Sequence, residues 1–214
     1  MIFLSPELQR YTEDHTSPEP PILRRLDRET HLKVLYPNMI SGHLQGRVLA
    51  MIARMIKPKR ILEIGTFTGY SAICMADGLD QQGEIITSDK NHELKELVEQ
   101  YFRDAEIDTK VAYIIGDAKK ELPRLKGMFD LVYLDADKEN YNHYFDLIID
   151  KVSPGGYILA DNVLWYGKVL DSYSDKLDAE TRAIKAFNQK VQKDKRVENV
   201  LLPIRDGLMA IRKI

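Results

Sequence analysis

From residue 60 onward, the sequence alternates between short, continuously apolar segments and longer segments with the apolar spacing of helices. Five apolar segments have the length of strands: 60–65, 84–89, 110–117, 129–136 and 156–163. Helical patterns lie around them, at 44–56, 70–79, 92–107, 118–125, 141–152 and 178–193. Strands without polar alternation, separated by helices, are typical of a parallel sheet covered by helices on both faces. The alternation therefore predicts an α/β fold.

The C-terminal part departs from this alternation. Its two apolar segments, 197–204 and 207–214, are separated only by the turn residues around Asp206. Such a short connection predicts an antiparallel hairpin, because a parallel crossover needs a dozen or more residues. The prediction is a seven-stranded sandwich, mostly parallel, with a closing hairpin.

The N-terminal part is predicted to be helical. Ser5 followed by Pro6 is typical of a helix start, with a capping residue before a proline in the first turn. A proline-rich segment, 15–22, separates this helix from a second one that begins near Pro20. At 214 residues the chain fits a single domain, with residues 1–43 preceding a core at 44–214.

Composition excludes several classes of protein. A net charge of −2 gives no electrostatic case for a nucleic-acid or acidic-membrane surface. Cys74 is the only cysteine, which rules out an internal disulfide and fits a reducing compartment. No apolar stretch approaches the roughly 20 residues that span a bilayer, and the start resembles no secretory signal. We expect a cytoplasmic protein without a membrane segment.

Aspartates lie at the ends of four predicted strands: Asp89, Asp117, Asp135 and Asp161. In open α/β sheets, ligands bind at the carboxyl ends of the strands. Four acids at one edge exceed what solubility requires, so we expect a ligand site there.

The turn after the first strand, Gly65 to Gly69, lacks the middle glycine of a dinucleotide-binding loop. Glu63 adds a carboxylate, which repels phosphate but suits a ligand with an ammonium or sulfonium group. Asp89 can accept hydrogen bonds from both hydroxyls of a ribose, and residues 116–118 can line an adenine pocket. Although a lone glycine turn can simply reverse the chain, these residues together indicate S-adenosylmethionine.

A second set of residues suits a metal. If the fourth and fifth strands are neighbours, Asp135, Asp161 and Asn162 face one another across about 5 Å. Their oxygens suit Mg²⁺, Ca²⁺ or Mn²⁺, with Mg²⁺ preferred, and not zinc. The alternative is a helix cap at Asp135 and an ordinary loop pair at 161–162.

Lys138 follows Asp135 by three residues. Beside a divalent cation its pKa should fall, which would make it a general base. An ordinary ion pair with Asp135 or Asp137 is equally compatible with the spacing.

Three segments carry a resemblance to a known family: LEIGTFTGYSA, YLDADKENY and LADNVLWYG. In this order and spacing the chain resembles the cation-dependent O-methyltransferases of the caffeoyl-coenzyme A and catechol type, from about Met39 to the C-terminus. The resemblance implies a Rossmann-like class I methyltransferase fold and a homodimer. It also implies that residues 1–43 cover the donor and substrate side.

The resemblance assigns roles residue by residue. The metal ligands are Asp135, Asp161 and Asn162, and the catalytic residues are Lys138 and Asp135. Trp165 and Tyr166 match a substrate-lining stretch. The positions that match donor contacts are Met39, Ser41, Glu63, Gly65, Thr66, Ser71, Asp89, Ala118 and Asp137.

The acceptor is less constrained. A small aromatic with vicinal hydroxyls is the first expectation, but no glutamate stands in LLPIRDG where catechol O-methyltransferase has one. Many relatives have an acidic residue where this chain has His43, which can touch a ligand or merely cap a helix. Alternatives are methylation of 5-hydroxyuridine in tRNA and, more remotely, a nicotinamide-dependent oxidoreductase.

Overall fold

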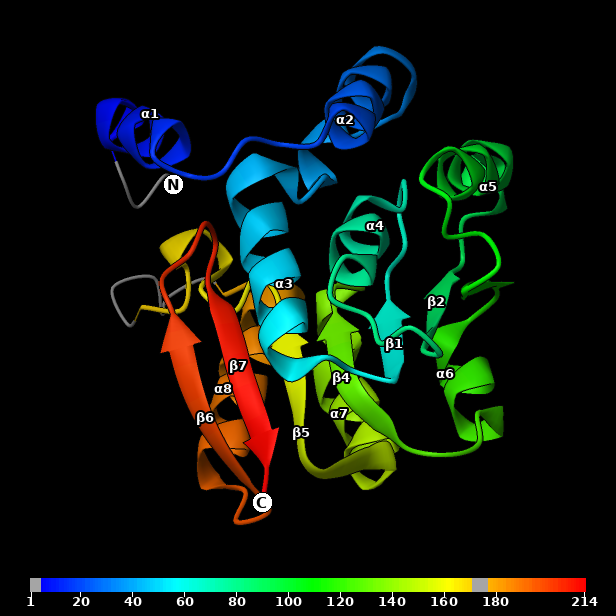
Figure 1. The fold of residues 1–214 in the computed structure, drawn as a ribbon. Helices are drawn as coiled ribbons and strands as arrows, with labels where there is room; N and C mark the ends of the chain where they lie inside the picture. The colour runs from blue at the N-terminus through cyan, green and yellow to red at the C-terminus, as the bar shows by residue number, and fades with distance from the viewer. Residues whose placement is uncertain (1–4, 171–176) are drawn as a thin grey trace. The chain divides into compact units, whose positions relative to one another are not determined.

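The computed structural model describes residues 5–170 and 177–214. Seven strands form one sheet in the order β3-β2-β1-β4-β5-β7-β6, with helices flanking the strands (Figure 1). Strand β7 runs antiparallel to both β5 and β6, so the predicted, mostly parallel sheet with a C-terminal hairpin is confirmed. By their contacts, the described residues divide into two compact units, 5–117 and 118–214 without 171–176, which are described in turn. The single-domain organisation and its boundary at residue 43 stay predictions.

The N-terminal unit contains three strands and five α-helices among its described residues. In chain order its elements are α1 Pro6–Asp14, α2 Pro21–Lys33, η1 Pro37–Met39, α3 Gly42–Ile56, β1 Arg60–Ile64, α4 Tyr70–Ala76, β2 Glu84–Asp89, η2 His92–Leu94, α5 Lys95–Asp104 and β3 Val111–Ile115. Ser5 caps α1 by accepting a hydrogen bond from the Leu8 backbone N–H, as its place before Pro6 predicts. The parallel register pairs Glu63 with Thr87 and Thr87 with Tyr113.

The helices α3 and α4 pack closely because glycines lie at their contacts. A Cβ at Gly46 would lie 2.7 Å from the Tyr70 ring and 2.9 Å from the Cys74 sulfur. At Gly78, just after α4, it would lie 2.2 Å from the α3 backbone. The sulfur of Cys74 is therefore enclosed by helix contacts, which supports a packing role for this residue.

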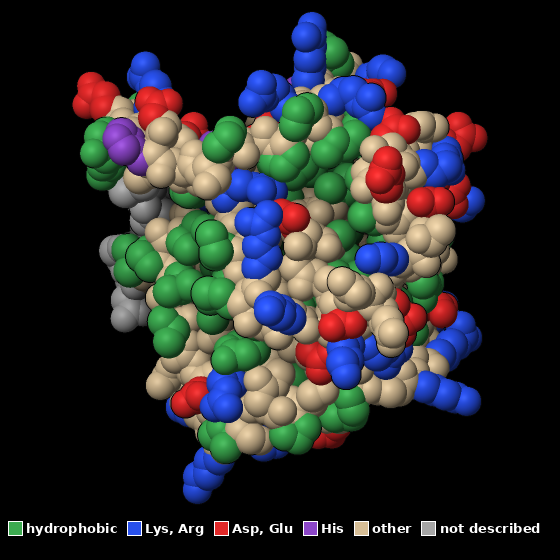
Figure 2. Space-filling view, viewed as in Figure 1, with side chains coloured by type: hydrophobic (Ala, Val, Ile, Leu, Met, Phe, Trp, Pro, Cys, Tyr) green, Lys and Arg blue, Asp and Glu red, His purple; other side chains and the backbone are tan. Residues whose placement is uncertain are grey.

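Basic side chains gather over α2, at the top of Figure 2. Two of these basic residues already have acidic partners, since Arg25 pairs with Asp104 and Lys33 lies 2.8 Å from Glu29. Much of the positive charge on this helix is thus compensated locally.

The C-terminal unit contains the other four strands. Its elements are α6 Ala118–Glu121, η3 Leu122–Arg124, β4 Phe129–Leu134, η4 Lys138–Asn140, α7 Tyr141–Ile148, η5 Ile149–Lys151, β5 Val152–Ala160, η6 Trp165–Gly167, α8 Ala179–Lys193, β6 Val197–Leu202 and β7 Leu208–Lys213. Residues 131–134 of β4 are all fully buried. The Phe187 ring of α8 meets Tyr141 and Phe145 of α7 edge-on, at 5.3 and 6.1 Å between centroids. These rings join the two helices into one core.

The fifth strand differs from its predicted bounds at both ends. It begins at Val152, four residues early, and so includes the Ser-Pro-Gly-Gly segment 153–156. Its pairing with β4 shifts in register between Phe129 and Leu131. It ends at Ala160 because Asn162 adopts a left-handed backbone, with φ of 58°, that cannot continue a strand. Asp161 and Asn162 therefore belong to a loop at the carboxyl end of the strand.

None of the described helices combines the length and the hydropathy needed to cross a membrane.

Candidate functional site

The glycine turn of the N-terminal unit is held in shape by Asp89. Gly65 and Gly69 have φ of 104° and 85°, and a Cβ at Gly69 would lie 2.8 Å from the Phe102 ring. The Phe67 backbone N–H donates to Asp89 Oδ2 at 2.8 Å, and the Asn91 N–H donates to Oδ1 at 2.8 Å. Each oxygen keeps a lone pair, so Asp89 can still accept hydrogen bonds from a ribose.

Glu63 lies under this turn as a fully buried carboxylate. Its Oε1 accepts from the Ser71 hydroxyl and its Oε2 from the Thr87 hydroxyl, both at 2.5 Å. Thr66 joins the network through Thr87, at 2.6 Å between hydroxyl oxygens. Sequence reasoning selected Glu63, Thr66 and Ser71 but missed Thr87, which the parallel register sets beside Glu63. Strand alternation and register were the signals that could have identified it.

The remaining donor residues predicted in this unit lie before α3. Met39 ends η1 with a side chain 60% exposed, whereas Ser41 is nearly buried at the N-terminal end of α3. Their part in donor binding stays a prediction.

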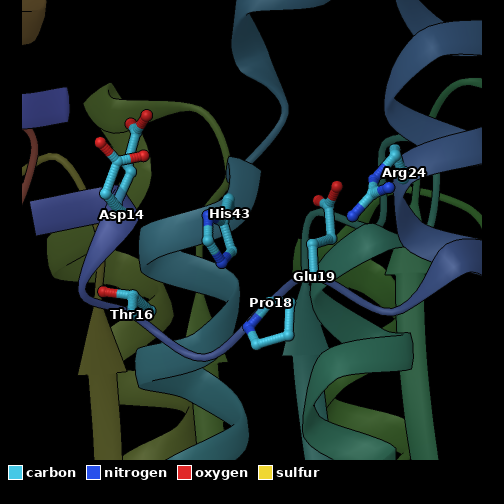
Figure 3. Close-up of a pocket in the computed structure, with 7 residues that line it drawn as sticks. Asp14, Thr16, Pro18, Glu19, Arg24 and His43 are labelled. Carbon is cyan, nitrogen blue, oxygen red and sulfur yellow. The ribbon is translucent and has the colours of Figure 1, made fainter.

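His43 lines a cavity of about 370 Å³ in the N-terminal unit (Figure 3). Its Nε2 lies 2.7 Å from the Ser17 carbonyl oxygen, which ties the first turn of α3 to the linker between α1 and α2. His43 thus contacts the linker between α1 and α2. Neither of the two roles predicted for it, touching a ligand or capping a helix, includes this contact. The other residues lining the cavity are Glu13, Asp14, Thr16, Pro18, Glu19 and Arg24.

In the C-terminal unit, β4 and β5 are parallel neighbours, as the metal hypothesis requires. Leu134 pairs with Ala160, and the Asp161 N–H donates to the Leu134 carbonyl at 3.0 Å. Asp135 and Asp161 therefore follow directly on paired strand ends. Asp161 is almost fully buried, and the Asp135 side chain is 21% exposed.

Lys138 lies between these acids and a tyrosine. Its Nζ donates to Asp135 Oδ1 and to the Tyr141 hydroxyl, both at 2.8 Å, with the side chain 9% exposed. Burial alone lowers the Lys138 pKa, but the charge of Asp135, with further contributions from Tyr141 and Asp161, outweighs burial and holds the pKa above its ordinary value. The predicted ion pair is present, and the pKa is shifted opposite to the direction expected beside a cation.

Two tyrosines that sequence reasoning missed support this cluster. The fully buried Tyr141 hydroxyl lies 3.0 Å from the Asp161 carbonyl oxygen and 3.2 Å from that of Leu134, and can donate to either. Tyr133 donates to Asp161 Oδ2 at 2.8 Å. Tyr133 lies in β4 and Asp135 follows just past its end, two residues later. Continued strand alternation would place both on the same face, a signal available in the sequence.

The metal site stays a prediction. The described residues include no group of three or more His, Cys, Asp or Glu side chains placed to hold a metal ion. The predicted set has two carboxylates and the Asn162 amide, which suits Mg²⁺, Ca²⁺ or Mn²⁺ chemically. Lys138 supplies one positive charge at Asp135, and two carboxylates with an amide oxygen are ligands that fit a hard cation.

The other predicted residues of this unit lie at element ends. Ala118 begins α6, and the exposed Asp137 precedes η4, where it accepts from the Tyr144 hydroxyl at 2.6 Å and from Asn140. Trp165 and Tyr166 form η6 with left-handed backbones, their rings 5.5 Å apart.

Comparisons with known proteins identify the family. A family model described as O-methyltransferase matches residues 13–214. Catechol O-methyltransferase domain-containing protein 1 of Mus musculus is 33% identical, over 97% of this chain and 80% of its own. The caffeoyl-CoA O-methyltransferase of Populus kitakamiensis is 32% identical, over 79% of this chain and 76% of its own.

Solved structures that are similar to this chain include methyltransferases with bound SAH. An SAH-bound methyltransferase of Podospora anserina matches with a TM-score of 0.89 and 29% identity, over 100% of this chain and 98% of its own. An O-methyltransferase of Bacillus cereus in complex with SAH matches with a TM-score of 0.90 and 25% identity, over 97% of each chain. The expected methyltransferase fold is thereby confirmed.

Proposed function

The chain belongs to the O-methyltransferase family, and we propose that it transfers the methyl group of S-adenosylmethionine to one hydroxyl of a small aromatic acceptor with vicinal hydroxyls, with the help of a divalent cation. The observation that carries this proposal is the cluster at the ends of β4 and β5, where Asp135 and Asp161 follow paired residues and Lys138 contacts Asp135.

Seven of the nine residues proposed to bind the donor lie in the N-terminal unit, and the other two, Ala118 and Asp137, lie in the C-terminal unit. The buried charge of Glu63 beneath the glycine turn disfavours a phosphate-bearing cofactor and favours a sulfonium nucleoside. The Asp89 carboxylate, oriented by two backbone N–H groups, is set to accept from the ribose hydroxyls. The two matched structures that contain SAH support the same ligand class.

The cation would be held by Asp135, Asp161 and Asn162. When bound, it supplies positive charge that lowers the pKa of an adjacent hydroxyl. Positive charge at Asp135 and Asp161 would also oppose the interactions that keep the Lys138 pKa high.

Lys138 is the proposed base. Its Nζ takes the proton of the acceptor hydroxyl, and the resulting oxyanion attacks the donor methyl carbon as the carbon–sulfur bond breaks. Tyr141 orients the amine, since its hydroxyl accepts from Nζ while it donates to a backbone carbonyl. Burial raises the pKa of Tyr141, so this hydroxyl stays protonated. Alignment of the two reactants supplies much of the rate.

The test is a methyl-transfer assay with labelled donor across catechols, caffeoyl esters, flavonoids and hydroxyuridine-containing tRNA. Each acceptor is tested after EDTA treatment and after Mg²⁺, Ca²⁺ or Mn²⁺ is restored. We expect EDTA to abolish transfer to a vicinal diol, a cation to restore it, and donor binding by calorimetry to persist throughout. Full activity after EDTA treatment would show the cation proposal to be wrong.

The tRNA arm tests the alternative acceptor. Basic side chains over α2 (Figure 2) suit phosphate contacts, but Arg25 and Lys33 are paired with acids. Transfer to tRNA with a steep salt dependence would favour that acceptor over a small aromatic. Family membership lends no support to a nicotinamide-dependent reaction. The homodimer is likewise a proposal, which light scattering of the purified protein tests.

A further inference from the structure

The loop after β5, residues 161–167, holds an unusual backbone. Asn162, Trp165 and Tyr166 all have positive φ, at 58°, 46° and 54°. Bulky residues rarely adopt this conformation, and it persists only where surrounding contacts impose it. Something must therefore hold this loop.

The turn between β6 and β7 supplies those contacts. The Val163 N–H donates to the Gly207 carbonyl at 3.1 Å, and the Leu164 N–H donates to the Asp206 carbonyl at 2.9 Å. The Tyr166 N–H donates to the Asp206 carboxylate, at 2.6 Å from Oδ1. Three backbone N–H donors of the loop, those of residues 163, 164 and 166, are thus satisfied by two residues of one turn.

The fit between turn and loop leaves no room for a side chain at residue 207. Gly207 has φ of 90°, and a Cβ there would lie 2.5 Å from the Leu164 side chain and 2.9 Å from its backbone nitrogen. The glycine allows Asp206 to come close enough to reach the Tyr166 N–H. On the other side, Asn188 of α8 donates to the Val163 carbonyl at 2.8 Å, which holds only the first half of the loop.

The position of Asp206 costs desolvation free energy. Its Oδ2 is buried and has no hydrogen-bond partner within the described ranges 5–170 and 177–214. Burial raises the Asp206 pKa, so the surroundings disfavour the charged form. Burying this carboxylate costs free energy. The hydrogen bond that its other oxygen, Oδ1, accepts from the Tyr166 N–H offsets that cost.

We propose that Asp206 is a positioning residue for the methyl acceptor: through the Tyr166 N–H it holds Trp165 and Tyr166 in the backbone conformation that presents them to the substrate. This inference rests on the proposed function, because it adopts for a methyl acceptor the substrate-lining role that the family resemblance implies for Trp165 and Tyr166.

The test uses Trp165, the single tryptophan of the chain, as a reporter of the loop. The variants are Asp206→Ala, which removes the acceptor of the Tyr166 N–H, and Asp206→Asn, which keeps an oxygen there. The matched control is Asp194→Ala, because Asp194 also accepts from a backbone N–H, that of Arg196 at 2.9 Å, in a turn before β6. The readouts are tryptophan emission, acrylamide quenching, and KM for acceptor and donor separately.

We expect Asp206→Ala to shift the emission and increase quenching, and to raise the acceptor KM about tenfold, because a small misplacement of substrate-positioning groups is costly. The donor KM should stay unchanged. Asp206→Asn and Asp194→Ala should both retain native emission and native acceptor KM. If Asp206→Ala does not fold, Gly207→Ala, which pushes Leu164 away, should give the same fluorescence and KM changes.

Native emission and native acceptor KM in both Asp206→Ala and Gly207→Ala would overturn the inference. A loss in Asp206→Asn equal to that in Asp206→Ala would also overturn it, since the oxygen facing Tyr166 is retained in Asn. If the wild type methylates no acceptor, the proposed function fails, and the fluorescence of the same variants still decides whether Asp206 holds the loop.

Discussion

The two units use buried carboxylates in different ways. In the N-terminal unit, Glu63 is fully enclosed and both oxygens accept from neutral hydroxyls of Ser71 and Thr87. In the C-terminal unit, Asp135 accepts from the Lys138 ammonium group, and Asp161 accepts from the Tyr133 hydroxyl and from the Asn162 N–H. A carboxylate enclosed by hydroxyls presents a fixed negative field, whereas carboxylates at paired strand ends suit a cation. The N-terminal unit is thus proposed to hold the donor, and the C-terminal unit to move a proton.

Replacing Lys138 tests the proton transfer proposed for the C-terminal unit and should have the largest effect. We expect Lys138→Met to lower kcat by about 10²–10⁴, the usual contribution of a positioned base, with donor affinity unchanged. Steady-state kinetics and donor calorimetry measure the two effects. Lys190→Met is a suitable control, because Lys190 pairs with Asp146 on the surface of the same unit. Equal losses in both variants would argue against a base at Lys138.

Tyr133→Phe tests whether the C-terminal carboxylates are arranged for a cation. It removes the hydrogen bond to Asp161 Oδ2. Loss of such a supporting bond typically weakens metal affinity about 10–100-fold, which a titration of activity with Mg²⁺ after EDTA treatment measures. A Mg²⁺ requirement identical to that of the wild type would mean that Tyr133 does not orient a metal ligand.

Glu63→Gln tests whether the negative charge of Glu63 in the N-terminal unit favours donor binding. The substitution keeps the size but removes the charge and one acceptor of the Ser71–Thr87 network, so we expect donor affinity to fall about tenfold. The protein should also lose about 1–3 kcal/mol of unfolding free energy, the cost of an unsatisfied buried group. Donor calorimetry and thermal denaturation check both effects, while metal affinity should not change. Unchanged donor binding would assign Glu63 to folding alone.

Cys74 gives the smallest expected effect, since neither carboxylate region uses it. Burial raises its pKa to about 12, whereas an unfolded thiol titrates near about 8.5. Between these values the folded state keeps a proton that the unfolded state loses, so this contribution to stability falls as pH rises from about 8.5 to 12. At pH 8 we expect native protein to resist iodoacetamide and denatured protein to react, as mass spectrometry can show. Rapid native alkylation would contradict the enclosed position between α3 and α4.

Much of the candidate site could be predicted because its residues are tied to strand ends. Asp135 and Asp161 follow apolar strands, and parallel neighbours bring such ends together. The supporting groups could not be chosen in the same way. The Tyr141 hydroxyl reaches carbonyls of residues 134 and 161, and many other tyrosines in the sequence offer the same group. The contact of Asp206 with Tyr166 spans 40 positions and leaves no periodic signal.

The sequence by itself determined the alternation of strands and helices, the closing hairpin, the glycine turn and the acids at the strand ends, because each depends on local spacing and backbone preference. Tertiary structure alone decided that Glu63 is satisfied by Thr87, that Lys138 is held by Tyr141, and that Asp206 holds the loop after β5. These contacts depend on the register between strands and on the packing of loops, where angstrom-scale distances select one partner among many chemically equivalent ones.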